Sequence, residues 1–270
     1  MEEHTSWLTQ FVNHYLGGAI LALLSALHLQ PSDPQLPIPE HVVMAMMVLV
    51  VGTLLALLIR SRLSVEKPGA MQQVAELLLT NNMGFGIRDI LDESVHHGGR
   101  KFISWVGAIG LFVLLANLLS VIPVFTSPTA SVTVPLACAM LTFIYFVYQG
   151  MRAQGVWGYI KHFAGDVWWL SPLIFPVEII STTARILSLT VRLWANIVAS
   201  DLIYGIFLGL FVGATTWGWD KSHILGVVLA IFPATLPILF IGLHIFVSIV
   251  QAYIFTILPS VYLGLATEHE

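Results

Sequence analysis

The chain has 270 residues, of which 57% are hydrophobic and only 10% are charged, and its formal net charge at pH 7 is −4. Soluble domains average about 25% charged residues, so this composition excludes an ordinary soluble protein and predicts an all-α polytopic membrane protein. A single cysteine and the lack of a glycine-rich phosphate-binding loop exclude a disulfide framework and the usual nucleotide sites, so we expect no cofactor, metal, nucleotide or nucleic acid as a ligand.

Residues 1–41 are expected to form an N-terminal interfacial segment and a linker, outside a single membrane channel domain at 42–270. The apolar stretch 11–29 is interrupted by polar residues and glycines. It therefore predicts a helix that lies at the membrane interface or is partly inserted, rather than a clean span. Four prolines between positions 31 and 39 indicate the linker.

Residues 42–59 form the first expected membrane span, which is long enough to cross a slightly thinned bilayer. The next segment, 60–101, is polar and carries six Lys and Arg residues. Within it, residues 71–91 place apolar side chains at helical spacing. This pattern predicts one amphipathic helix on the membrane surface.

Two further spans are expected at 103–122 and 134–149, joined by an uncharged loop that contains prolines. Two long helices follow, at 169–212 and 223–265, with a short Gly/Trp turn between them. Each corresponds to about 60 Å of helix, whereas the hydrocarbon core is only about 30 Å thick, so both must tilt steeply, bend or break. The short turn makes them antiparallel neighbours. This gives five membrane-embedded segments.

Lysine and arginine residues predict the orientation of the chain. None occurs before Arg60, whereas the segments 60–101 and 150–162 together carry eight. Basic loops of membrane proteins face the cytoplasm. We therefore expect the N-terminus outside and the C-terminus in the cytoplasm.

The first long helix carries ionisable residues inside an apolar region, and most of its polar residues fall within roughly 40° of one line along the helix. They are Glu178, Ser181, Arg185, Ser188, Arg192 and Asn196. We call them the polar seam. Charged groups at membrane depth are costly and usually functional, and an arginine cannot shed its proton to avoid that cost. Asp201 points to the opposite side of the helix, so it is not expected to neutralise Arg192. A seam that only joins helices within a bundle is the alternative.

The second long helix places His244, Ser248 and Gln251 on one face. In an antiparallel pair joined near residue 222, Arg192 lies level with Gln251, and Asp201 lies level with His244. The expected orientation then places Asn196, Asp201 and His244 on the outer side of Arg192. The rest of the seam, from Glu178 to Ser188, lies on the inner side. These are two polar half-paths separated by a fixed cation, which implies a mobile carboxylate on a partner.

Two stretches of these helices, LTVRLWANIVASDLI and HIFVSIVQAYIFTILPSVYL, resemble the signature regions of subunit a of F-type rotary ATP synthases. The resemblance extends from about residue 42 to the end, and the role of the first 41 residues is open. It implies a non-catalytic stator channel in a bacterial plasma membrane, beside a ring of c subunits and held by b-type peripheral stalk subunits.

The resemblance also assigns roles to single residues. Arg192 matches the essential arginine of the family, and Asn196 and Gln251 match its conserved amides. Asp201 and His244 match the outer-channel acid and histidine, with Asp where some members have Glu. Glu178 matches the inner-channel acid.

A secondary ion-coupled transporter is the alternative function, because charged, broken helices also mark that class. The sequence shows no repeated half, which transporters usually have. Arg185 could also pair with Glu178 or extend to the interface instead of lining the path. Asn117 is expected to form a helix–helix hydrogen bond. The coupling ion is expected to be the proton rather than sodium, because His244 suits a proton relay better than a sodium site of oxygen ligands.

Overall fold

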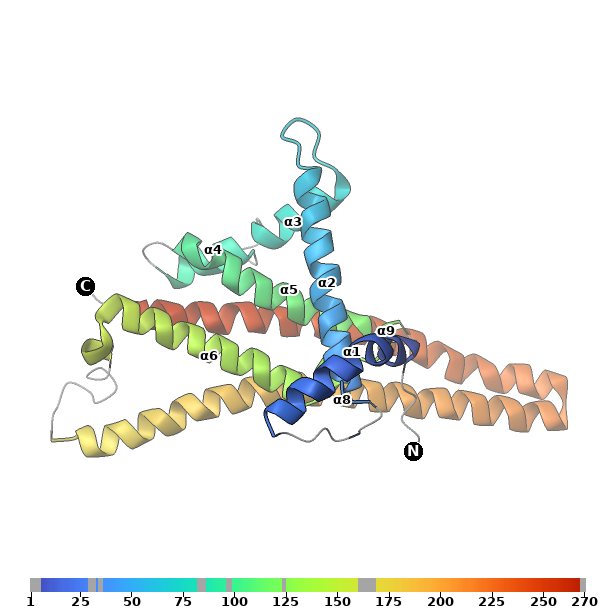
Figure 1. Ribbon diagram of the computed structural model, residues 1–270. Helices are drawn as coiled ribbons and strands as arrows, with labels where there is room; N and C mark the ends of the chain where they lie inside the picture. Colours follow the sequence, from blue (N-terminus) through green and yellow to red (C-terminus); the bar gives the residue numbers. More distant parts are fainter. Residues whose placement is uncertain are drawn as a thin grey trace.

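The computed structural model describes residues 6–28, 33, 36–81, 86–95, 99–122, 125–159 and 169–267, without the side chains of 224–225, 228–237 and 266–267. Within these ranges the regular structure is helical, as expected (Figure 1). The longer elements are α1 Trp7–Ala26, α2 Glu40–Ser61, α3 Ala70–Leu79, α4 Ile87–Ser94, α5 Ile103–Leu119, α6 Thr133–Gln154, α8 Ser171–Lys221 and α9 His223–Thr267. Two short 3-10 turns, η1 Gly99–Phe102 and η2 Pro128–Ala130, precede α5 and α6.

Five described helices are long and apolar enough to cross a membrane, which confirms the expected number. They are α2, η1 with α5, α6, α8, and the Ile238–Leu265 part of α9. The non-helical turn expected at 213–222 is much shorter than expected. α8 continues to Lys221, and only Ser222 is extended, with φ −166° and ψ 138°. Each glycine in this stretch costs roughly 1 kcal/mol in a helix, and packing against α9 offsets that cost.

The helices α8 and α9 lie side by side and antiparallel, across the direction of α2 (Figure 1). Two ring contacts establish their register. Phe207 stacks on Phe240 with ring centroids 4.9 Å apart, and the Arg185 guanidinium lies 5.1 Å from the centroid of the Tyr262 ring. Both pairs lie within two to four residues of the expected register, and the connection falls at residue 222 as expected.

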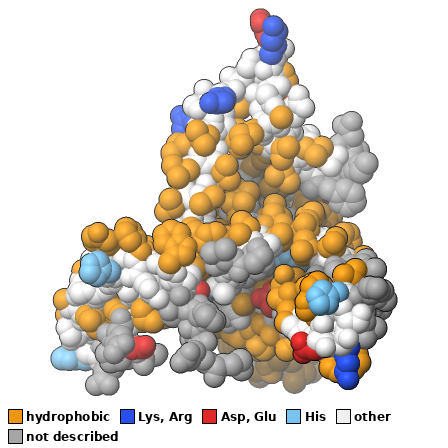
Figure 2. All heavy atoms as spheres, turned by 90° about the vertical axis from the view of Figure 1, so that its right-hand side faces the viewer, with side chains coloured by type: hydrophobic (Ala, Val, Ile, Leu, Met, Phe, Trp, Pro, Cys, Tyr) orange, Lys and Arg blue, Asp and Glu red, His pale blue; other side chains and the backbone are white. Residues whose placement is uncertain are grey.

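Apolar side chains from four helices meet in a core around α9. One cluster comprises Val113 of α5, Cys138 and Ala139 of α6, Leu189, Leu193 and Ile197 of α8, and Phe255 of α9. A second cluster joins α4, η1 and α5 to the end of α9 through Leu91, Val95, Phe102, Val106 and Leu263. The sides of these helices that face away from the clusters are largely apolar and exposed, which suits contact with lipid (Figure 2).

The single surface helix expected at 71–91 is wrong, because the structure has two helices, α3 and α4, and residues 82–85 lie outside the described ranges. The reason is local. Thr80 is extended, with φ −143° and ψ 120°, and the Asp89 carboxylate accepts a hydrogen bond of 2.8 Å from the Asn81 amide. This carboxylate contact joins the non-helical residue after α3 to the first turn of α4. α4 also buries Ile90 and Leu91.

Within the segment 1–41, residues Trp7–Ala26 form the helix α1, which contacts Ile38 just before α2. The buried Asn13 side chain accepts a hydrogen bond of 2.9 Å from the Ile38 amide and donates one of 3.0 Å to the Ile38 carbonyl. Its position at the membrane interface stays a prediction. In Figure 1, α1 lies near the beginning of α2, at the opposite end from the basic loop after α2. The orientation of the chain across the membrane stays a prediction.

A close contact between α4 and α9 gives the first prediction. The Gly264 backbone packs directly on the Ser94 carbonyl, so an added methyl group would overlap backbone atoms. We expect Gly264→Ala to lower the free energy of unfolding by about 1–3 kcal/mol, as overpacking does. Thermal unfolding of the purified chain in detergent measures it. Gly242→Ala, in the same helix with no atom within 4 Å of its new methyl group, is the matched control and should leave stability unchanged or slightly raised. Equal behaviour of the two variants would contradict this packing.

Candidate functional site

The polar seam lies at the edge of the buried side of α8. Thr182, Leu189, Leu193 and Ile197 are buried, whereas the seam residues are half-buried or exposed. Glu178, Ser181, Arg185 and Asn196 are half-buried, and Ser188 and Arg192 are exposed. The seam therefore lies partly against neighbouring helices and partly on the outer surface of α8.

Arg192 is exposed beside apolar side chains. Val191 is 51% exposed and Leu187 is 54% exposed. Within the described part of the chain no carboxylate pairs with Arg192, and the ion pair found there joins Arg88 and Asp92 of α4 at 3.7 Å. An unpaired guanidinium on an apolar surface requires either water or an opposite charge from outside this chain.

Arg185 does not form the ion pair with Glu178 that the sequence left open. Its guanidinium instead stacks on Tyr262, next to a small cavity of about 20 Å³ between α6, α8 and α9. Glu178 lies near the buried Tyr159 hydroxyl, and burial together with this carboxylate raises the pKa of Tyr159. Both contacts lie toward the end of α6 that leads into the basic loop. This end is the expected inner side.

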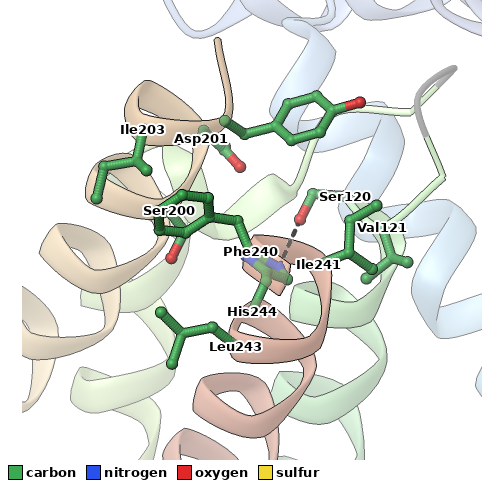
Figure 3. A pocket seen from close by; sticks show the side chains of 10 residues that line it. Ser120, Val121, Ser200, Asp201, Ile203, Phe240, Ile241, Leu243 and His244 are labelled. Carbon is green, nitrogen blue, oxygen red and sulfur yellow. Dashed lines mark hydrogen bonds between the residues drawn. The ribbon is translucent and has the colours of Figure 1, made fainter. Parts of the chain in front are cut away.

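Asp201 and His244 line one cavity of about 70 Å³, as their expected register requires (Figure 3). Its walls come from the end of α5 (Ser120, Val121), from α8 (Ser200, Asp201, Ile203, Tyr204) and from α9 (Phe240, Ile241, Leu243, His244). A volume of this size accommodates several water molecules. The end of α5 that contributes Ser120 is the one expected to face outside, so the cavity lies on the expected outer side.

His244 is 8% exposed and held by α5. Its Nε2 lies 2.9 Å from the Ser120 hydroxyl and 3.1 Å from the Asn117 carbonyl oxygen. The Asn117 side chain in turn accepts a hydrogen bond of 2.7 Å from Thr129, whose hydroxyl is 2.6 Å from that of Ser127. The Asn117 side chain thus bonds to η2, and the contact between α5 and α9 is made by the Asn117 backbone carbonyl and His244.

Ser120, Ser127 and Thr129 were not expected from the sequence to belong to the site. The sequence contains only a weak indication of this network: Asn117 and Ser120 are three residues apart at the end of an apolar span and therefore lie on one face of a helix. On α9, Ser248 donates to the His244 carbonyl at 2.8 Å, and Gln251 is 2% exposed with no described partner for its Oε1. No hydrogen bond or ion pair in the described structure joins Gln251 to Arg192, and their expected position at one level stays a prediction.

The arrangement suits proton transfer on one side and charge recognition on the other. A carboxylate, an imidazole and space for water in one cavity can pass protons in either direction. The exposed guanidinium can bind an anionic group presented from outside. Among the described residues no group of three or more His, Cys, Asp or Glu side chains could hold a metal ion.

The chain is similar in sequence to known proteins. The family described as ATP synthase A chain matches residues 41–264. The chain is 40% identical over 268 residues to ATP synthase subunit a of Koribacter versatilis, covering 98% of each protein. It is 35% identical over 258 residues to ATP synthase subunit a of Solibacter usitatus, covering 96% of this chain and 99% of that one. The segment before residue 41 therefore has a counterpart in these relatives, although it lies outside the family match.

The hydroxyl network beside His244 gives the second prediction. Thr129→Val keeps the shape of a fully buried side chain but removes the donor to Asn117 and the contact to Ser127. We expect the free energy of unfolding to fall by about 1–3 kcal/mol, because a buried polar group loses its partner. Calorimetry of the purified chain measures this. Thr133→Val, at an exposed position in the same region, should change stability by less than about 0.5 kcal/mol. Equal stability of the two variants would count against the network.

Proposed function

We propose that the chain, which belongs to the ATP synthase A chain family, forms two proton half-channels beside a rotating ring of c subunits. Proton flow through them would couple the transmembrane gradient to ATP synthesis. The chain itself would carry no catalytic site. The observation that carries this proposal is the exposed guanidinium of Arg192 on an apolar helix face, without an ion pair in the described structure.

The unpaired arginine fits a ring carboxylate that passes it during rotation. Such a carboxylate must be neutral while it faces lipid, because a bare charge there is costly. When the carboxylate passes Arg192, the positive charge of the guanidinium favours the ionised form of the carboxylate. The same fixed cation repels a proton that would otherwise cross directly between the half-channels. Arg192 thus acts both as the partner of the ring carboxylate and as a barrier.

The outer half-channel would use Asn196, Asp201 and His244. The cavity shared by Asp201 and His244, at the expected outer end of α5, supports this assignment. The inner half-channel would use Glu178, Ser181, Arg185 and Ser188. The contact of Arg185 with Tyr262, close to the junction of α9 with α4, supports the inner position. Gln251 would face the passing carboxylate near Arg192.

The partners would be the c ring, b-type peripheral stalk subunits and the lipid bilayer of a bacterial plasma membrane. The exposed apolar surface of α8 near Arg192 suits an apolar ring surface. Family membership favours this role over a secondary transporter. The proton remains the expected coupling ion because of the buried His244.

The Arg192→Ala variant tests the proposal in the assembled complex. ATP-driven proton pumping into inverted vesicles should fall to background, and passive proton leak should rise because the barrier is lost. Arg192→Lys keeps the charge without the planar fork, and we expect it to fail in coupled transport as well. Lys221→Ala removes an exposed cation at the far end of the same helix and should pump normally. Normal pumping by Arg192→Ala would refute the proposed function.

The orientation gives a further prediction. Cysteines introduced at the exposed positions Lys67 and Arg152 should react with a membrane-impermeant thiol reagent only from the cytoplasmic side. A cysteine at the exposed Thr126 should react only from outside. The native Cys138 is buried, so background labelling should be low. Labelling of position 67 or 152 from outside would overturn the orientation.

A further inference from the structure

The helix α5 ends beside His244 and offers it a carbonyl group. The last carbonyls of a helix lack partners within the helix. The Val121 amide donates to Leu118 at 3.1 Å, so the Asn117 carbonyl does not receive it. Two side-chain groups approach the Asn117 carbonyl instead. The Ser120 hydroxyl lies at 3.0 Å and His244 Nε2 at 3.1 Å.

Counting hydrogens at this point assigns a hydrogen to Nε2 of the imidazole. A carbonyl oxygen can only accept, so Nε2 of His244 must carry a hydrogen to form the contact with Asn117. The Ser120 hydroxyl has one hydrogen, which it donates to the same carbonyl. Its oxygen is then free to accept from Nε2 at 2.9 Å. One N–H is thus shared between two acceptors, and every group in the contact is satisfied.

With the hydrogen on Nε2, the lone pair of the neutral ring lies on Nδ1. Among the described residues no hydrogen bond involves Nδ1, whereas the ring itself lines the cavity that also contains Asp201. The titratable groups that line this cavity with His244 are Asp201 and Tyr204, both on α8. The α5 side contributes only uncharged groups, Ser120 and Val121.

We propose that Ser120 and the Asn117 carbonyl fix His244 with its hydrogen on Nε2, so that protons enter and leave the imidazole through Nδ1. Ser120 is then a positioning residue of the outer half-channel. This inference rests on the proposed function for its role in transport, but the assignment of the hydrogen stands apart from it.

The proton transfer balances without rearrangement of the ring. Nδ1 accepts a proton from a hydronium ion in the cavity, which breaks one O–H bond, forms an N–H bond at Nδ1, and leaves an imidazolium and a neutral water molecule. The proton then leaves Nδ1 for the Asp201 carboxylate or for water, and the neutral ring returns with Nε2–H intact. The bonds to Ser120 and Asn117 persist through both steps, so the negative end of α5 faces the imidazolium whenever it forms.

Solid-state NMR on the assembled complex tests the assignment directly. The full chain would be labelled with ¹⁵N-histidine and compared with a His244→Gln sample, so that the difference spectrum isolates His244. We expect a neutral ring with hydrogen-bearing Nε2 and an unprotonated Nδ1. Hydrogen on Nδ1 in the neutral ring would overturn the proposal, whatever the transport activity of the complex.

Ser120→Ala tests the positioning role. We expect proton-driven ATP synthesis in vesicles to slow roughly 2- to 10-fold, the factor that one neutral hydrogen bond supports. The dependence of the rate on outer pH should shift, and Ser120→Thr, which restores a hydroxyl, should recover most of the rate. Ser131→Ala, a serine in the adjoining segment whose hydroxyl contacts Thr133, is the matched control and should synthesise ATP normally.

A double variant separates positioning from a merely structural role. His244→Gln keeps an amide donor near Nε2 but lacks Nδ1. Ser120→Ala added to His244→Gln should cause no further loss, because Ser120 acts through the imidazole. If the loss is the same in both backgrounds, or if threonine gives no recovery in an assembled complex, Ser120 does not position His244 and the inference fails.

If Arg192→Ala pumps normally while the NMR assignment holds, the proposed function fails and the hydrogen assignment survives. The two proposals are therefore distinguishable.

Discussion

The antiparallel packing of α8 on α9 is the constraint on which the rest of the structure depends. The two helices have 51 and 45 residues, or roughly 75 and 70 Å, more than twice the thickness of the hydrocarbon core. They lie across α2 instead of beside it (Figure 1). The helices α5 and α6 then cover one side of the pair, and the other side stays exposed. The polar groups of one hairpin are thereby divided between a buried side and a surface.

The two sides carry their polar groups in opposite ways. On the buried side, His244 and Ser248 are hydrogen-bonded, which avoids a desolvation penalty of about 1–3 kcal/mol each, whereas the Oε1 of the buried Gln251 has no described partner. On the exposed side, Arg192 has no ion pair in the described structure. A charge left unpaired on an apolar surface makes sense if another protein supplies its partner. The difference between these residues is the physical basis for assigning them different roles.

Sequence patterns predicted the parts of this fold that depend on long runs of residues. The five spans follow from hydropathy, and the meeting of Asp201 and His244 follows from counting along two antiparallel helices. Single contacts were not predictable. The division of the surface helix depends on one carboxylate, Asp89, and the helix through 213–221 depends on packing against α9. The contact of Arg185 with Tyr262 could not be predicted from the sequence either, because an ion pair between Arg185 and Glu178 fits the helical spacing equally well.

The end of α5 shows why uncharged polar residues occur in an apolar span. A helix that ends within or near a bilayer leaves carbonyls that need donors, and a buried imidazole needs a partner for its N–H. Contact between the Asn117 carbonyl and His244 Nε2 gives the carbonyl a donor and the imidazole N–H an acceptor. The Ser120 hydroxyl contacts both groups. Asn117 and Ser120 carry no charge and lie at the end of an apolar span, so their contribution becomes visible only when α5 and α9 are packed together. The contact that gives the last turn of α5 a partner for its carbonyl therefore also holds the His244 ring in place, and this ring lines the cavity with Asp201.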